Sequence, residues 1–269
     1  MDSIGFIGGG NMAEALIKGL IKAGVCKPAD IIVSDVSQQR LTHLAKEYAV
    51  KTAGDNKAAA SKADIVVLSI KPQKAAEVLQ DIKGSIKSGT LVVSIMAGKK
   101  ISSITGTLGD VPVVRVMPNT PALIGEGMSA LFANKKAEKL LDKAARLFSA
   151  VGRTVIVESE DLMDAVTAIS GSGPAYFFLF MEHLYAAAVK LGLSEEQAGQ
   201  LVLQTAKGAA LLAAEAAGKG KTAEQLRHDV TSPGGTTQKA IEIFEGRGLK
   251  QIIADAIEAA YKRSQELSK

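Results

Sequence analysis

The sequence predicts an α/β domain followed by an all-helical domain. Over residues 1–159, short runs of Val, Ile and Leu alternate with amphipathic runs, a pattern typical of a parallel sheet with helices on both faces. From residue 160 onward no run reads as a convincing strand, and four or five helices follow. A glycine-rich turn joins the first apolar run to the first amphipathic run. We therefore expect a dinucleotide-binding domain at 1–159 and a helical domain at 160–269.

Composition narrows the class of protein. The chain has 269 residues, which is long enough for a substantial core. Its net charge of +4 comes from dispersed basic residues, so we expect no nucleic-acid partner. Cys26 is the single cysteine and the three histidines are far apart, so we expect no metal site. The N-terminus lacks the basic region of a signal peptide, and charged residues interrupt the most apolar helix, 175–193. We expect a cytoplasmic protein without a membrane span.

Gly8, Gly10 and Ala13 match the dinucleotide fingerprint G-x-G-x-x-A. Gly8 permits a tight turn, Gly10 lets a pyrophosphate approach the backbone, and Ala13 allows a helix to pack closely on a strand. The pattern follows the apolar run 3–7 and precedes the amphipathic run 11–23, whose N-terminus would attract phosphate. A glycine turn without a ligand is the alternative, and the strand–turn–helix context favours dinucleotide binding.

The other elements follow from the same alternation. Aliphatic runs predict strands at 3–7, 30–34, 65–70, 91–95, 112–116, 127–132 and 153–157. The amphipathic runs between them predict helices at 11–23, 37–47, 56–61, 73–81, 101–107 and 135–150.

The helical domain has its own boundary signals. We expect helices at 161–170, 174–192, 194–217, 222–229 and 237–267, the last broken at 246–248. Ser194 and Gln197 form a capping box at the start of the third of these helices. Because a domain of about 110 residues made only of helices often completes its core with a second chain, we expect an obligate homodimer through this region.

The end of the second strand carries mixed signals about the cofactor. Asp35 could accept hydrogen bonds from the ribose hydroxyls of NAD, whereas Ser34, Ser37 and Arg40 could hold the 2′-phosphate of NADP. Asp35 or Ser37 could instead cap the following helix. We expect a preference for NADPH, with NADH possible.

Three further strand ends have polar or small residues in turn-forming contexts. They are Lys71–Pro72, Met96–Gly98 and Met117–Pro121. Taken singly, each is explained by ordinary turn chemistry. Ligands bind outside the carboxyl ends of parallel strands, so the three segments together predict the floor of a nicotinamide pocket.

Two glycine loops interrupt the helices after residue 160. The first, Ser170–Pro174, contains Gly171 and Gly173 and ends in a proline suited to a first helical turn. The second, Thr231–Thr237, leads through glycines and hydroxyls into another helix, which makes it a candidate anion site. An N-cap turn without a ligand is the alternative for the second loop.

These motifs, in this order along the whole chain, resemble pyrroline-5-carboxylate reductases. The matching segments are Gly8–Ala13, Lys71–Pro72, Met117–Pro121, Ser170–Ala175 and Asp229–Thr237, of which the last is the most specific. The resemblance implies NAD(P)H-dependent reduction of 1-pyrroline-5-carboxylate to L-proline, the last step of proline biosynthesis. It also implies an N-terminal Rossmann domain and a helical C-terminal domain that intertwines with a second subunit, commonly within a decamer.

The chemistry of the reaction agrees with the residues present. The substrate is a cyclic imine whose nitrogen is easily protonated, so hydride attack needs positioning groups and little help from an acid. The two loops supply Ser, Thr and Gly, without a His, Tyr or Lys placed as an acid. The second loop could bind the substrate carboxylate through backbone N–H groups. The resemblance places the Thr237 hydroxyl near the ring nitrogen as the catalytic group.

The candidate site therefore has two sets of residues. The cofactor set is Gly8, Gly10, Asn11, Met12, Ser34, Asp35, Arg40, Asn56, Lys71, Pro72, Met96, Ala97, Gly98 and Asn119. The substrate set is Ser172, Ser232, Gly234, Gly235, Thr236 and Thr237.

Two other functions remain as alternatives. A β-hydroxyacid dehydrogenase would need a lysine followed four residues later by an asparagine, whereas Lys207 in the 194–217 helix is followed by Leu211. A non-catalytic redox sensor would bind the dinucleotide without turnover and would leave the loop Ser232–Thr237 without a purpose.

Overall fold

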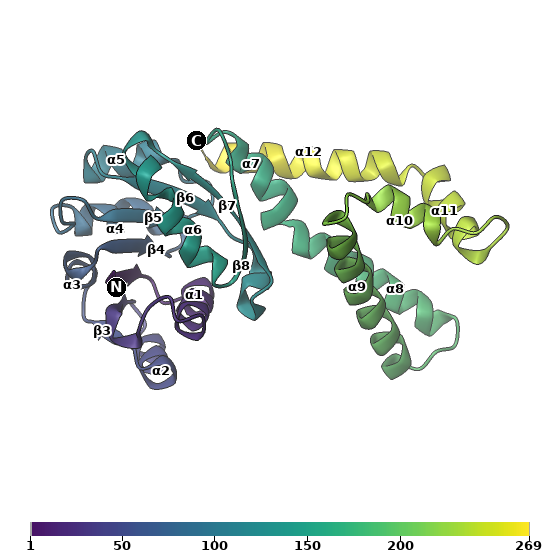
Figure 1. Ribbon diagram of the computed structural model, residues 1–269, viewed down its shortest axis with the longest axis horizontal. Coiled ribbons are helices and arrows are strands. Elements are labelled where there is room, and N and C mark those ends of the chain that lie inside the picture. The colour runs from purple at the N-terminus through teal and green to yellow at the C-terminus, as the bar shows by residue number, and fades with distance from the viewer. Residues whose placement is uncertain (1, 269) are drawn as a thin grey trace. The chain divides into compact units, whose positions relative to one another are not determined.

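The computed structural model describes residues 2–268 and contains two compact units (Figure 1). The first unit runs to Pro174 and also includes the chain from Ala260 onward, whereas the second unit is Ala175–Ala259. The C-terminal turns of the chain therefore belong to the first unit. Among the described residues, no helix is long and apolar enough to cross a membrane.

The first unit is built on one eight-stranded sheet in the order β3-β2-β1-β4-β5-β6-β7-β8. Strands β1 to β6 are parallel, β7 runs antiparallel to β6, and β8 runs parallel to β7. The central strands are buried on both faces, where apolar side chains pack well, and this explains why they are mostly Val, Ile and Leu. The strands are β1 (Ile4–Ile7), β2 (Ile31–Ser34), β3 (Lys51–Ala53), β4 (Ile65–Leu68), β5 (Leu91–Ser94), β6 (Val113–Met117), β7 (Gly127–Ala133) and β8 (Gly152–Ile156).

Every predicted strand is present, and two features of the sheet differ from the expectation. β3 was not predicted because its three residues, Lys-Thr-Ala, lie at the sheet edge with two of them exposed, so they form no apolar run. The sheet is also not parallel throughout. A single 3₁₀ segment, Thr120–Ile124, joins β6 to β7, and it is too short for the crossover that a parallel pair requires.

Two layers of helices cover the sheet. Leu16 and Phe148 belong to the core between one face and the helices α1, α2 and α6. Leu79 and Ile104 belong to the core between the other face and the helices α3, α4 and α5. The bounds are α1 (Asn11–Lys22), α2 (Gln38–Tyr48), α3 (Asn56–Lys62), α4 (Ala75–Ile82), α5 (Ile101–Leu108) and α6 (Leu141–Ser149), the last preceded by a 3₁₀ segment at Lys135–Leu140.

The helices after residue 160 also occur where the sequence predicts them, with two local changes. The segment expected as one helix at 161–170 is α7 (Leu162–Val166) followed by a π-helical turn at Thr167–Gly171. The last expected helix is split into α11 (Thr236–Gly246) and α12 (Leu249–Leu267), with Gly248 between them at φ +75°. The others are α8 (Gly173–Lys190), α9 (Glu195–Ala217) and α10 (Ala223–Asp229).

The second unit buries few of its apolar side chains. Within its residues, all of which the structure describes, only Ala198 and Ala216 are buried. On α8, Phe177 is 69% and Phe178 is 61% exposed, and further apolar residues are exposed on α9: Leu201, Leu203, Leu211 and Leu212. A large exposed apolar surface of this kind marks a site of protein association.

Candidate active site

The fingerprint turn after β1 has the backbone that its glycines permit. Gly8 has φ +97°, and a Cβ there would lie 2.4 Å from the carbonyl oxygen of Ser69. Gly10 is the N-cap of α1, and no atom lies within 4 Å of the place where its Cβ would be. The turn is therefore closed on the side of the sheet and open above the N-terminus of α1, which suits a pyrophosphate.

Both backbone polar groups of Gly9 are held by side chains that follow β2. Its N–H donates to Asp35 Oδ2 at 2.7 Å. Its carbonyl oxygen accepts from Arg40 Nε at 2.9 Å and from Arg40 Nη2 at 2.7 Å. Asp35 and Arg40, both predicted to contact the cofactor, thus also brace the turn that would carry its phosphates.

Glu14, which sequence analysis did not single out, joins this brace to α1. Its carboxylate accepts from Arg40 Nη2 at 2.7 Å and from the Tyr48 hydroxyl at 3.1 Å, and lies 2.7 Å from Nε2 of His43. Burial raises the pKa of Glu14, but the hydrogen bonds with His43, Arg40 and Tyr48 outweigh it and bring the pKa to about 2. Glu14 is therefore an anion that keeps the Arg40 guanidinium beside the turn.

The other predicted cofactor residues near the end of β2 have two roles: one caps a helix, and two form a chain of side-chain hydrogen bonds. Ser37 is the N-cap of α2 and its Oγ accepts from the Arg40 N–H at 3.3 Å, which is the capping role that the sequence left open. Ser34 is buried, and its Oγ donates to Asn56 Oδ1 at 2.9 Å. Asn56 in turn donates to Asp81 Oδ2 at 3.1 Å. The structure therefore brings Ser34 and Asn56 together at the carboxyl end of β2.

The predicted cofactor residues that follow β4 and β5 differ in how exposed they are. Lys71 is exposed and begins the 3₁₀ turn Pro72–Lys74 without a side-chain cap. After β5, Met96 and Gly98 are buried and Ala97 between them is exposed. Ala97 is therefore the residue of this strand end whose side chain is accessible to a ligand.

Asn119, after β6, connects its strand end to the first glycine loop. Its Nδ2 donates to the Ser170 carbonyl oxygen at 3.2 Å, and its Oδ1 accepts from the Met128 N–H at 2.8 Å. A Cβ at Gly171 would lie 2.5 Å from Cε of Met117, so this loop packs directly on the end of β6. Ser172 follows in the same unit, at the edge predicted to hold the nicotinamide.

The second glycine loop lies in the second unit and leads into α11. Gly235 is the N-cap of α11, and its N–H donates to the Ser232 carbonyl oxygen at 3.0 Å. The Gly234 N–H donates to Gln238 Oε1 at 2.6 Å, so Gln238 occupies a donor that we had expected to face the substrate. Within residues 2–268, the half-buried Thr237 hydroxyl has no hydrogen-bond partner.

Gln238 could have been found in the sequence. It stands three residues after the N-cap, the position at which Glu or Gln reaches back over a helix start. Arg115 and Glu160 had no such signal. The Arg115 side chain on β6 is 4% exposed, and its Nη1 donates to Glu160 Oε1 at 3.0 Å, across 45 positions of sequence.

Comparison with known proteins covers the whole chain. Residues 3–98 match the family described as NADP oxidoreductase, coenzyme F420-dependent, and residues 160–267 match the family described as pyrroline-5-carboxylate reductase dimerisation. The pyrroline-5-carboxylate reductase of Pseudomonas aeruginosa is 46% identical over 267 residues, which cover 98% of this chain and 96% of that protein.

Solved structures give the same result. A pyrroline-5-carboxylate reductase from Coxiella burnetii has a TM-score of 0.92 at 41% identity and covers 100% of this chain and 99% of its own. The Plasmodium falciparum pyrroline carboxylate reductase, solved with NADP bound, has a TM-score of 0.88 at 33% identity and covers 100% and 98%. The predicted architecture, a Rossmann domain followed by a helical dimerisation domain, is confirmed. With its motifs, fold and full-length relatives in agreement, the chain belongs to the pyrroline-5-carboxylate reductase family.

Proposed function

We propose that this chain reduces 1-pyrroline-5-carboxylate to L-proline by hydride transfer from NAD(P)H, the last step of proline biosynthesis. The observation that carries the proposal is similarity over nearly the full length to relatives of that name, 46% identical in the Pseudomonas aeruginosa protein. A positioning site without a strong acid is sufficient for this reaction, because the protonated imine is itself a good hydride acceptor.

The first unit would hold the dinucleotide. The open space above Gly10, together with the N-terminus of α1, is a place where a pyrophosphate could accept backbone hydrogen bonds. Ser34 and Asn56 would lie near the adenosine ribose, and Ala97 and Asn119 would border the nicotinamide. When bound, NADPH supplies the hydride. NADPH is the expected cofactor, as the Plasmodium falciparum relative was solved with NADP, and NADH is a possible substitute.

The second glycine loop would hold the substrate. In the first turn of α11, the N–H groups of Thr236, Thr237 and Gln238 have no acceptor within the helix, so they suit the carboxylate better than the Gly234 N–H does. The unpartnered Thr237 hydroxyl is available to bond the imine nitrogen and to pass it a proton. Ser172 and Ser232 would border the substrate.

The assembly and the location of the protein are part of the same proposal. The exposed apolar residues of α8 and α9 support a homodimer through the helical domain, within a decamer as the family resemblance implies. We propose residues 1–159 as the cofactor domain and 160–269 as the dimerisation and substrate domain. We also expect a cytoplasmic protein, and cell fractionation tests this.

One assay separates the proposed function from its alternatives. Purified protein is incubated with NADPH and 1-pyrroline-5-carboxylate, the loss of NADPH absorbance is followed, and proline is identified as the product. A redox sensor would bind NADPH without turnover. A β-hydroxyacid dehydrogenase would act on a β-hydroxyacid instead, which the pair Lys207 and Leu211 does not favour.

A further inference from the structure

The strand end Met96–Gly98 is backed by the last turn of α12. Gly98 is buried with φ +67°, and a Cβ there would lie 2.9 Å from the carbonyl oxygen of Leu267. Both segments belong to the first unit, in which the C-terminal end of the chain lies beside α7 (Figure 1). The C-terminal turn therefore packs against Met96–Gly98, the segment that is predicted to border the nicotinamide.

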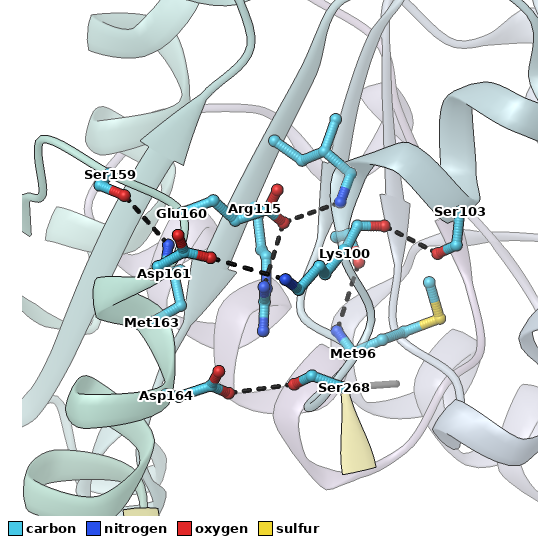
Figure 2. A network of polar contacts seen from close by, with 12 residues as sticks. Met96, Lys100, Ser103, Arg115, Ser159, Glu160, Asp161, Met163, Asp164 and Ser268 are labelled. Atoms are coloured by element: carbon cyan, nitrogen blue, oxygen red, sulfur yellow. Dashed lines mark hydrogen bonds and ion pairs between the residues drawn. The ribbon is translucent and has the colours of Figure 1, made fainter. Parts of the chain in front are cut away.

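Two serines fix that turn to α7. Ser264 Oγ donates to Asp164 Oδ1 at 2.7 Å. Ser268 Oγ lies within hydrogen-bond distance of two acceptors, the same Asp164 oxygen at 3.0 Å (Figure 2) and the Ser264 carbonyl oxygen, also at 3.0 Å. Asp164 is 6% and Ser264 is 5% exposed. Hydrogen bonds to a carboxylate are about twice as strong as those between neutral groups. We call Asp164, Ser264 and Ser268 the serine clamp.

The segment that leads into α7 also holds the other end of the same loop. Glu160 Oε1 accepts from the Ile101 N–H at 2.7 Å and from Arg115 Nη1 at 3.0 Å. Asp161 Oδ1 lies 3.5 Å from Lys100 Nζ, and Figure 2 shows these contacts converging in front of the sheet. The loop between β5 and α5 is thus tied at its α5 end by Glu160 and backed at Gly98 by the clamped turn.

Between those two ends, the Met96 side chain is buried in the core, and the backbone makes few close hydrogen bonds. A cavity of about 1010 Å³ lies beside it, lined by Gly98, Lys100, Asp164 and Gln265 among others. Within the loop, the Met96 N–H to Ser94 Oγ and Lys99 N–H to Met96 carbonyl distances are both 3.4 Å, which is long for a hydrogen bond. The backbone position of Ala97 and Gly98 therefore depends on the buried Met96 side chain and on the contacts at the two ends of the loop.

We propose that the serine clamp positions Met96–Gly98 for cofactor binding, which makes Asp164 and Ser264 positioning residues for the reaction. The proposal rests on the proposed function, because it takes the carboxyl end of β5 as the nicotinamide edge. The clamp holds the Leu267 backbone against Gly98 and so prevents this strand end from receding. Loosening the clamp weakens cofactor binding while the sheet remains intact.

The test compares the wild-type chain with the double variant Ser264→Ala/Ser268→Ala. Without the two hydroxyls, the Kd for NADPH should rise about five- to tenfold, with a matching rise in its KM and a change in kcat below about twofold. Amide hydrogen exchange across residues 96–100 should become faster. Asp164→Ala should behave like the double variant. Asp164→Asn keeps the accepting oxygen and should restore a near wild-type Kd.

Thr90→Val is the matched control. Thr90 is buried just before β5, and its hydroxyl donates to the Ala63 carbonyl oxygen at 3.1 Å. The Thr90→Val variant therefore loses one buried hydrogen bond at the opposite end of the same strand. It should lower Tm without changing the Kd for NADPH. The clamp proposal is overturned if the serine double variant also lowers Tm but leaves the Kd and the exchange at 96–100 unchanged.

The outcomes separate the two proposals. Wild-type protein that binds NADPH but does not reduce 1-pyrroline-5-carboxylate overturns the proposed function, while the Kd series still decides the clamp. Normal turnover with unaffected clamp variants overturns the clamp alone. A wild-type chain that binds no NADPH overturns both.

Discussion

Arg40 holds Gly9 by two hydrogen bonds, from its Nε and Nη2 atoms to the Gly9 carbonyl oxygen, at 2.9 Å and 2.7 Å. Asp35 holds the N–H group of the same glycine at 2.7 Å. Asp35 and Arg40, which the sequence suggests as residues that distinguish NADP from NAD, therefore hold the turn that would bind the phosphates of either cofactor.

Arg40→Ala should weaken both cofactors. Because the variant releases the Gly9 carbonyl, the KM for NADPH and the KM for NADH should each rise about tenfold, as expected for the loss of a hydrogen bond to a charged group. Steady-state kinetics with both cofactors measure this. Direct binding of the 2′-phosphate by Arg40 predicts a rise for NADPH alone, and that selective result would contradict the brace.

Ionised Glu14 should stabilise the fold, so the free energy of unfolding should fall at acidic pH. Despite burial, its hydrogen bonds with His43, Arg40 and Tyr48 lower its pKa from 4.5 to about 2. Since the pKa is depressed in the folded state, the stabilisation is complete above pH 4.5 and is lost as the pH falls toward 2. Glu14→Gln should lower the free energy of unfolding at neutral pH by roughly 1–3 kcal/mol.

Urea denaturation of the wild-type chain and of Glu14→Gln at several pH values checks this dependence. The difference between the two free energies of unfolding should shrink as the pH falls below 4.5. A difference that stays constant down to pH 2 would show that ionisation of Glu14 does not contribute.

Thr237→Val keeps the shape of the side chain and removes the hydroxyl. If that hydroxyl bonds the imine nitrogen, kcat/KM for 1-pyrroline-5-carboxylate should fall ten- to a hundredfold, from a loss of about 1.5–3 kcal/mol. The affinity for NADPH should not change. Gly235, and not Thr237, is the N-cap of α11, so a large loss of helix stability is not expected.

Thr231→Val is the control for Thr237→Val. The Thr231 hydroxyl donates to the Arg227 carbonyl oxygen at 2.6 Å in the same loop, so this variant reports the effect of a lost structural bond. A Thr237→Val enzyme with wild-type turnover and a lower Tm would refute the catalytic role of the hydroxyl.

The exposed aromatic residues of α8 should hold two copies together. Phe178→Asp places a charge on the surface that a second chain would cover, and should shift the protein from dimer or larger assembly toward monomer in sedimentation velocity at micromolar concentration. His183→Asp, at an exposed polar position of the same helix, should leave the assembly unchanged. A wild-type chain that sediments as a monomer would contradict the proposed interface.

The fold was largely predictable because its signals are local. The aliphatic runs Ile65–Leu68 and Leu91–Val93 are buried on both faces, and a strand in that setting is marked in the sequence by consecutive apolar residues. β3 escaped prediction because an edge strand of three residues is formed by its neighbour and not by its own pattern. The reversed direction of β7 follows from a short connection, which strand patterns do not reveal.

The site was predictable as a set of loops, and less so in its contacts. The glycine motifs mark the turns because the backbone there excludes other residues, as at Gly8. The sequence shows that Arg40 is charged, but its partners Gly9 and Glu14 lie 31 and 26 positions away and are brought near only by the packing of α1 against α2. The same distance in sequence conceals the bonds of Ser264 and Ser268 to Asp164.

The small number of buried side chains in the second unit has a thermodynamic consequence. A helical unit that buries only Ala198 and Ala216 among its described residues gains little from the hydrophobic effect by itself. When a second copy covers the apolar surface of α8 and α9, folding is coupled to dimerisation, and the stability of the folded state depends on the protein concentration. The melting temperature of the protein should then rise with its own concentration, so that dilution alone makes it less resistant to heat.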